Sequence, residues 1–135
     1  MVKYLLDTNI VIYTMKNRPQ QVRRRFKEKH GRMGISTVTL GELIFGAEHS
    51  KQVERNLADI EAFTARLDVL PFDESAAYHF GQIRAELYRT GNPIGPYDMM
   101  IAGHARAYGL KLVTNNVEEF ERVQGLFIEN WIENC

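Results

Sequence analysis

Short apolar runs alternate along the chain with longer stretches in which apolar residues recur every three or four positions. The short runs predict buried strands over Val2–Leu6, Met33–Ser36, Val69–Phe72, Leu110–Thr114 and Leu126–Trp131. The longer stretches predict helices that begin at Ile10, span Pro19–Lys29, run from Thr37 or Thr39 to Ala47, and span Lys51–Leu67, Glu74–Arg89 and Met99–Tyr108. Strands separated by helices are typical of an α/β fold, with a mainly parallel central sheet and helices on both faces.

The length of the chain fits one hydrophobic core. With 135 residues and 44% hydrophobic content, we expect a single domain over residues 1–135. No apolar run approaches the roughly 18 residues of a membrane span, and the N-terminus does not resemble a secretory leader. The single cysteine, Cys135, leaves no internal disulfide. We therefore expect a protein of the cytoplasm, without membrane contact.

Polar residues directly follow two of the predicted strands. Asp7 comes after the first strand, and Asn115 and Asn116 come after the fourth. In parallel sheets ligands bind beyond the carboxyl ends of the strands, so these positions predict a pocket. Asp7 also suits the N-cap of the following helix, and taken alone it fits either role.

Two further acids lie in or beside predicted helices. Glu42 is flanked by Leu40 and Leu43, and a carboxylate beside the core needs a partner. Asp98 follows the Gly- and Pro-rich segment Thr90–Pro96, which predicts that it caps a helix, faces a ligand, or does both. Isolated acids without paired histidines or cysteines favour Mg²⁺ or Mn²⁺ over zinc.

The formal net charge is zero, but the basic residues are unevenly distributed. Eight of the seventeen lie between positions 16 and 32: Lys16, Arg18, Arg23, Arg24, Arg25, Lys27, Lys29 and Arg32. This basic stretch fits either a solvated surface or a phosphate-binding one. The sequence contains neither a Gly-rich phosphate loop with Lys-Ser/Thr nor a G-x-S-x-G elbow, which disfavours P-loop nucleotide hydrolysis and nucleophilic serine chemistry.

Four segments in order resemble the PIN-domain VapC toxins of bacterial toxin–antitoxin pairs, in particular the enteric and plasmid-borne members. They are Leu5–Ile12, Thr39–Leu43 with Gly46–Ala47, Pro93–Asp98 with Ile101–Ala102, and Leu112–Asn116 with Glu119–Phe120. The match covers essentially the whole chain. Each string is weak alone, but their order and spacing together are specific.

The resemblance implies a PIN-like fold and RNA cleavage that depends on Mg²⁺ or Mn²⁺. The acidic positions of the family fall on Asp7, Glu42 and Asp98, which would be catalytic and bind the metal. Many PIN domains have Asp where this chain has Asn116, so we assign the fourth catalytic role to Glu119. The groups expected to orient the acids or the water are Asn9, Thr114 and Asn116.

The resemblance also implies a substrate and partners. Its enteric members cut transfer RNA, notably the initiator, in the anticodon loop. A cognate VapB antitoxin would block the acidic site, and the toxin would form a homodimer. The basic stretch gains weight as an RNA-binding surface, with Arg18, Arg23, Arg24, Arg25 and Lys27 as its contacts.

Two other functions stay open. A degenerate PIN module would bind RNA or a partner without cutting, although the presence of Asp7, Glu42 and Asp98 together argues against it. A PIN nuclease that acts on DNA would usually carry extra helices, for which this chain has no spare length.

Overall fold

The computed structural model describes residues 1–132, so Cys135 lies outside the described residues. The strands are β1 (Tyr4–Leu6), β2 (Met33–Ser36), β3 (Asp68–Leu70), β4 (Lys111–Val113) and β5 (Phe127–Glu129). The helices are α1 (Thr8–Asn17), α2 (Gln20–Glu28), α3 (Thr37–Glu48), α4 (Val53–Thr64), α5 (Glu74–Arg89), α6 (Pro96–Ala107) and α7 (Val117–Phe120).

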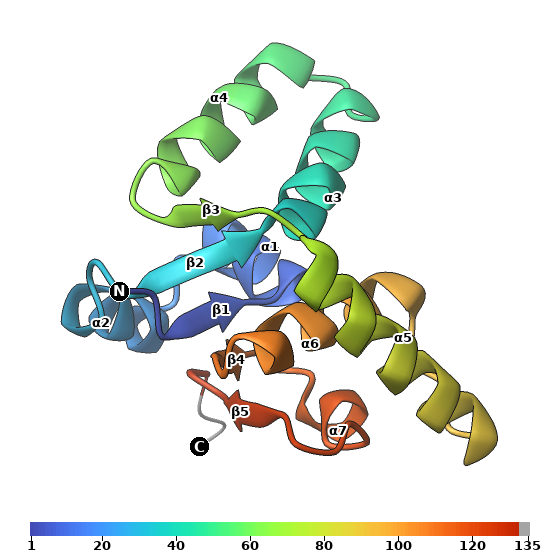
Figure 1. Cartoon of the computed structure of the whole chain (residues 1–135). Helices are drawn as coiled ribbons and strands as arrows, with labels where there is room; N and C mark the ends of the chain where they lie inside the picture. Colours follow the sequence, from blue (N-terminus) through green and yellow to red (C-terminus); the bar gives the residue numbers. More distant parts are fainter. Residues whose placement is uncertain (133–135) are drawn as a thin grey trace.

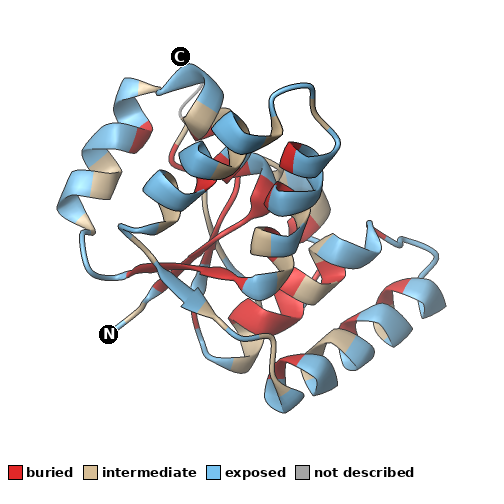
Figure 2. Ribbon diagram, turned by 90° about the horizontal axis from the view of Figure 1, so that it is seen from above, coloured by how far each residue is buried: buried red, intermediate tan, exposed pale blue. Residues whose placement is uncertain are grey.

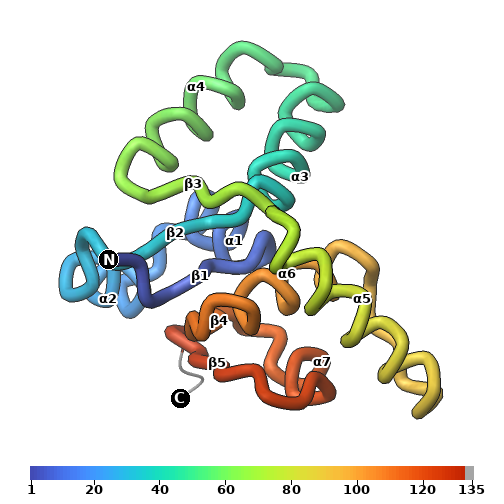
Figure 3. The backbone as a smooth tube through the Cα atoms, viewed as in Figure 1, coloured from blue at the N-terminus to red at the C-terminus, as the bar shows by residue number. Residues whose placement is uncertain are grey.

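The strands form one parallel sheet in the order β3-β2-β1-β4-β5. Strand β1 therefore lies between β2 and β4, which are distant in sequence (Figures 1 and 3). The chain moves outward from β1 to β3 on one side and from β4 to β5 on the other. The strand order thus reverses between β1 and β4, which is where open α/β sheets place their ligand sites. The predicted α/β fold is confirmed.

Each face of the sheet carries its own hydrophobic core. Successive side chains of a strand point to opposite faces, so Leu5 packs with α5, α6 and α7, whereas Tyr4 and Leu6 pack with α1 to α4. The central strands and the inner sides of the helices are buried, and the outer sides are exposed (Figure 2). Two covered faces explain why the strands are short apolar runs without polar alternation.

Helices α5 and α6 pack unusually closely. A Cβ atom on Gly103 of α6 would lie 2.6 Å from the backbone nitrogen of Phe80 in α5. Only glycine fits at this crossing. The contact fixes α6, whose first turn carries Asp98, against the rest of its layer.

Several predicted boundaries were wrong. Helix α6 begins at Pro96, so Asp98 lies inside its first turn and does not precede it. Ser36, and neither Thr37 nor Thr39, caps α3 by accepting a hydrogen bond from the backbone N–H of Val38. The short helix α7 was not predicted. Within residues 1–132, the helices are too short or too polar to span a membrane.

Candidate active site

Asp7 is fully buried at the carboxyl end of β1. Its Oδ1 accepts a hydrogen bond of 2.7 Å from the backbone N–H of Ile10, which makes Asp7 the N-cap of α1. Its Oδ2 accepts a bond of 2.6 Å from the hydroxyl of Thr114, just beyond β4. The role as N-cap is confirmed, and capping fixes the carboxylate at the position where the strand order reverses, so it is compatible with the second role considered for Asp7.

Glu42 is held by side chains from α1 and α3. The hydroxyl of Thr8 donates a hydrogen bond of 2.6 Å to Glu42 Oε1. The hydroxyl of Thr39 lies 3.0 Å from that of Thr8, and both threonines are buried. A hydroxyl has one proton, and Thr8 gives it to the carboxylate, so Thr39 is the donor in the second bond. Glu42 thus has the partner that its position beside the core requires.

Asp98 and Glu119 approach from the opposite side, on α6 and α7. Both are half-buried. Glu119 Oε2 accepts a hydrogen bond of 2.9 Å from the side-chain amide of Asn116. The backbone N–H of Asn116 donates to the Thr114 hydroxyl at 2.9 Å, and the same hydroxyl donates to Asp7. A continuous hydrogen-bond chain therefore links Glu119 to Asp7.

The four carboxylates also act on one another electrostatically. Burial raises the pKa of Asp7 to about 6 against the hydrogen bonds from Thr114 and Ile10, and the charges of Asp98 and Glu42 raise it further. Burial likewise raises the pKa of Asp98 to about 6, with the charges of Glu119 and Glu42 adding to the effect. No cationic side chain acts on either group among the described residues. The site is an uncompensated negative cluster.

This donor set fits a hard divalent cation. Carboxylate oxygens are the preferred ligands of Mg²⁺ and Mn²⁺, and a cation would offset the mutual repulsion that raises the pKa values of Asp7 and Asp98. Within residues 1–132, however, no three acidic, histidine or cysteine side chains stand close enough together to form a ready-made metal site. The carboxylates therefore need to rotate inward to share an ion.

Two predicted groups have no hydrogen bond to this cluster within residues 1–132. Asn9 is exposed in the first turn of α1 and has no hydrogen bond to the carboxylates in the described part of the chain. The basic stretch includes α2, which lies near the end of the sheet where β1 begins (Figure 1). There Lys29 Nζ is 5.4 Å from the centre of the Tyr4 ring. The structure therefore places α2 away from the acids, whereas Asn9 follows Asp7 by only two residues at the start of α1.

Three residues that support the cluster, Thr8, Ser36 and His104, were not predicted from the sequence. Thr8 carried the clearest available signal, because it directly follows Asp7 and opens the helix that Asp7 caps. Ser36 and His104 carried none. They are both buried, and Ser36 Oγ lies 2.9 Å from His104 Nδ1. This contact joins the start of α3 to α6 across 68 residues of sequence, and so fixes the helices of Glu42 and Asp98 relative to each other.

A parallel sheet with four interacting carboxylates at the point where its strand order reverses defines a class of acidic-site α/β proteins that suits metal-assisted phosphodiester chemistry. The family described as PIN domain matches residues 4–126. The chain belongs to this family, in its VapC branch.

Two similar relatives come from enteric bacteria and are named as endonucleases. A tRNA(fMet)-specific endonuclease VapC from Shigella flexneri is 62% identical over 131 residues, which cover 97% of this chain and 99% of the relative. The protein of the same name from Salmonella typhimurium is 58% identical, with the same coverage. The crystal structure of DNA-bound VapBC from Salmonella typhimurium contains a chain that is 57% identical, with a TM-score of 0.95 over 98% of this chain and all of that one. The predicted resemblance is confirmed.

Proposed function

We propose that this protein is the toxin of a type II toxin–antitoxin pair, a single-domain endoribonuclease that cuts initiator transfer RNA with the help of Mg²⁺ or Mn²⁺. The observation that carries the chemistry is the group of four interacting carboxylates with no cation among the described residues to offset it. The substrate comes from the two enteric relatives, which are named for tRNA(fMet). A transfer-RNA substrate also places the proposed activity in the cytoplasm.

In this proposal Asp7, Glu42 and Asp98 hold the metal, and Glu119 completes the site. A bound divalent ion supplies a water of lowered pKa and shields the charge of the scissile phosphate. Thr114 keeps one oxygen of Asp7 in place, while Thr8 does the same for Glu42. Asn116 holds Glu119 from the other side, so these hydrogen bonds limit how far Asp7, Glu42 and Glu119 must turn to share an ion.

The proposed regulatory partner is a VapB-type antitoxin, because the similar solved structure is a VapBC complex. An exposed apolar surface is available on α3, where Phe45 is 67% exposed and Ile44 38% exposed. Antitoxin binding there would lie on the helix that carries Glu42. We also propose the homodimer that the family resemblance implies.

The test is cleavage of purified initiator transfer RNA by the antitoxin-free protein. We expect a discrete cut in the anticodon loop with Mg²⁺ or Mn²⁺, no cut with EDTA, and recovery when excess metal is returned. The Asp98→Asn variant should not cut, and its circular dichroism spectrum should match the wild type. Intact RNA under all metal conditions would refute the nuclease and favour a binding module. Equal cleavage of a single-stranded DNA of the anticodon-loop sequence would favour the DNA-directed alternative.

A further inference from the structure

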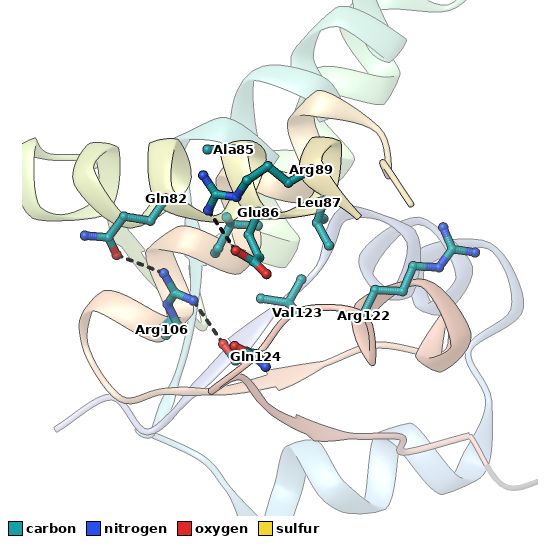
Figure 4. A pocket seen from close by; sticks show the side chains of 10 residues that line it. Gln82, Ala85, Glu86, Leu87, Arg89, Arg106, Arg122, Val123 and Gln124 are labelled. Atoms are coloured by element: carbon teal, nitrogen blue, oxygen red, sulfur yellow. Dashed lines mark hydrogen bonds and ion pairs between the residues drawn. The ribbon is translucent and has the colours of Figure 1, made fainter. Parts of the chain in front are cut away.

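A cavity of about 420 Å³ lies between α5, α6 and the segment that follows α7 (Figure 4). Of the ten residues that line it, three are arginines, namely Arg89, Arg106 and Arg122, and one is acidic, Glu86. We call it the arginine cavity. Arg89 lies in α5, Arg106 in α6 and Arg122 in the segment after α7, so the fold brings the three positive charges together although they are far apart in the sequence.

Arg106 is fixed in place without an acidic partner. Its guanidinium donates to His79 Nδ1 at 2.9 Å, to the carbonyl oxygen of Gln124 at 2.9 Å and to Gln82 Oε1 at 3.1 Å. All three acceptors are neutral, and no ion pair to Arg106 occurs within residues 1–132. Burial lowers the pKa of Arg106, which reflects the cost of a partly desolvated cation that lacks a counter-charge. An anion in the cavity would supply that charge.

The two other arginines are exposed and free to adjust. Arg89 pairs with Glu86 at 2.8 Å, but both side chains are well exposed, so the pair is weak. Arg122 donates one bond of 3.3 Å to the carbonyl oxygen of Pro93. Three arginines against one glutamate leave a net charge of plus two on the cavity wall. Planar guanidinium groups suit phosphate oxygens, which they can bind two at a time.

The arginine cavity adjoins the acidic cluster. Arg122 is three residues after Glu119, and its backbone N–H donates to the carbonyl oxygen of Glu119 at 3.2 Å. Residues three apart in a helical turn are neighbours, about 5–6 Å between Cβ atoms. Pro93, which accepts from Arg122, belongs to the segment that leads to Asp98. A strand of RNA that passes the acids can therefore continue directly over these arginines.

The acidic cluster itself repels RNA, so the affinity for the phosphate backbone must come from cations within reach of the bound strand. The basic stretch on α2 lies at the opposite end of the sheet, whereas Arg122, on the wall of the arginine cavity, lies one turn of the chain from Glu119. We propose that the arginine cavity binds a phosphodiester group of the RNA substrate, next to the one that is cut. This inference rests on the proposed nuclease function.

The experiment measures binding of fluorescently labelled initiator transfer RNA to the full-length Asp98→Asn protein, which does not cut, over a series of salt concentrations. In this background we compare Arg122→Gln, Arg106→Gln and the double variant Arg89→Gln/Arg122→Gln. Each lost phosphate contact should lower the slope of log Kd against log salt by about one, and the double variant should bind about tenfold more weakly. The matched control is Arg55→Gln/Arg66→Gln, which also removes two positive charges, one inside α4 and one just after it.

Arg106 also joins α5, α6 and the chain after α7, so the melting temperature of Arg106→Gln is measured alongside. Arg122 is exposed, and its variant keeps the test valid if Arg106→Gln unfolds. A salt slope unchanged in both Arg122→Gln and the Arg89/Arg122 double variant would overturn the proposal. So would unchanged RNA binding combined with weaker capture of the VapB antitoxin, because the cavity would then be a protein-docking site. Failure of the wild type to cut RNA is a separate result, which refutes the nuclease itself.

Discussion

The two ends of the sheet carry opposite charge and are built in different ways. At the carboxyl end, Asp7 and Glu42 each accept a hydrogen bond of 2.6 Å from a buried threonine. At the other end, Arg23 and Arg24 of α2 are exposed, and no ion pair to either occurs within residues 1–132. The sequence shows the acids as isolated residues and the basic residues as one stretch, and of the two groups it is Asp7 and Glu42 that are hydrogen-bonded to buried side chains.

This difference distinguishes the candidate active site from a charged but exposed surface. A carboxylate buried among other carboxylates costs folding free energy, and a fold keeps such a group only where it is held and used. Exposed arginines cost almost nothing and can be kept for solubility alone. The acidic end should therefore respond strongly to single substitutions, whereas the basic end should tolerate them.

The largest effect is expected from Asp7→Asn. The amide still accepts from the backbone N–H of Ile10 and can donate to the Thr114 hydroxyl, so the fold is kept while the negative charge is lost. Cleavage of initiator transfer RNA should fall by about a thousandfold, as expected when a metal-binding carboxylate is removed. Single-turnover rates at saturating Mg²⁺ measure this. A loss of less than tenfold would remove Asp7 from the catalytic group.

The same variant should be more stable than the wild type at neutral pH. The pKa of Asp7 is about 6 in the folded protein and 3.8 in an unfolded chain, so the folded state binds the proton more tightly. In the wild type the contribution of Asp7 to stability is therefore greatest below pH 3.8 and is lost as pH rises through 6, by an amount on the order of 2–3 kcal/mol.

Urea unfolding without divalent metal, at intervals between pH 4 and pH 8, measures the difference between wild type and Asp7→Asn. The stability advantage of the variant should grow over this interval and then level off above pH 6. Adding Mg²⁺ at pH 7.5 should narrow the gap, because the cation binds the four carboxylates of the wild type more tightly than the three that remain in the variant. A gap that is independent of both pH and Mg²⁺ would contradict the electrostatic origin of the raised pKa.

A smaller effect is expected from Thr8→Val, which removes the hydrogen bond that orients Glu42. We expect cleavage to fall by about tenfold, with a larger change in kcat than in KM, since Glu42 still binds metal but in a less fixed orientation. Thr14→Val is the matched control on the same helix. The Thr14 hydroxyl is buried without a partner in the described structure, so its removal should leave cleavage unchanged. Equal losses in both variants would point to damage of α1 instead.

Much of the fold followed from the sequence because local signals agreed with it. The apolar runs of β1 and β4 and the acids placed at the ends of strands or inside helices were visible without coordinates. The start of α6 was predicted too late because Pro96 is favoured in a first helical turn, where its missing N–H is not needed. Helix α7 is only four residues long and too short to show a period.

The rest of the site depended on contacts between distant residues. Thr114, which meets Asp7 across 107 residues, was expected near the acids only because of the family resemblance, and Ser36 and His104, which meet across 68, were not expected there. No local pattern encodes such pairs, because each threonine, serine or histidine looks ordinary in its own segment. The arginine cavity could not be predicted for the same reason, because its three arginines are separated in the sequence. The basic stretch, by contrast, was conspicuous because its residues are adjacent in sequence, which is no guide to where the substrate lies.

The smallest effect is accordingly expected at the basic end of the sheet. Arg23→Gln/Arg24→Gln removes two charges from α2, whose side chains at these positions are exposed. If the basic stretch is a solvated surface with no contact to RNA, RNA binding at about 0.15 M salt should weaken by less than about twofold. Charges that lie more than one Debye length from the bound RNA are largely screened. Titration of labelled initiator transfer RNA into the Asp98→Asn background measures this against the Arg89/Arg122 pair. A tenfold loss from the α2 pair would show that the RNA spans both ends of the sheet. Burial would then distinguish the residues needed for catalysis, but not those needed for RNA binding.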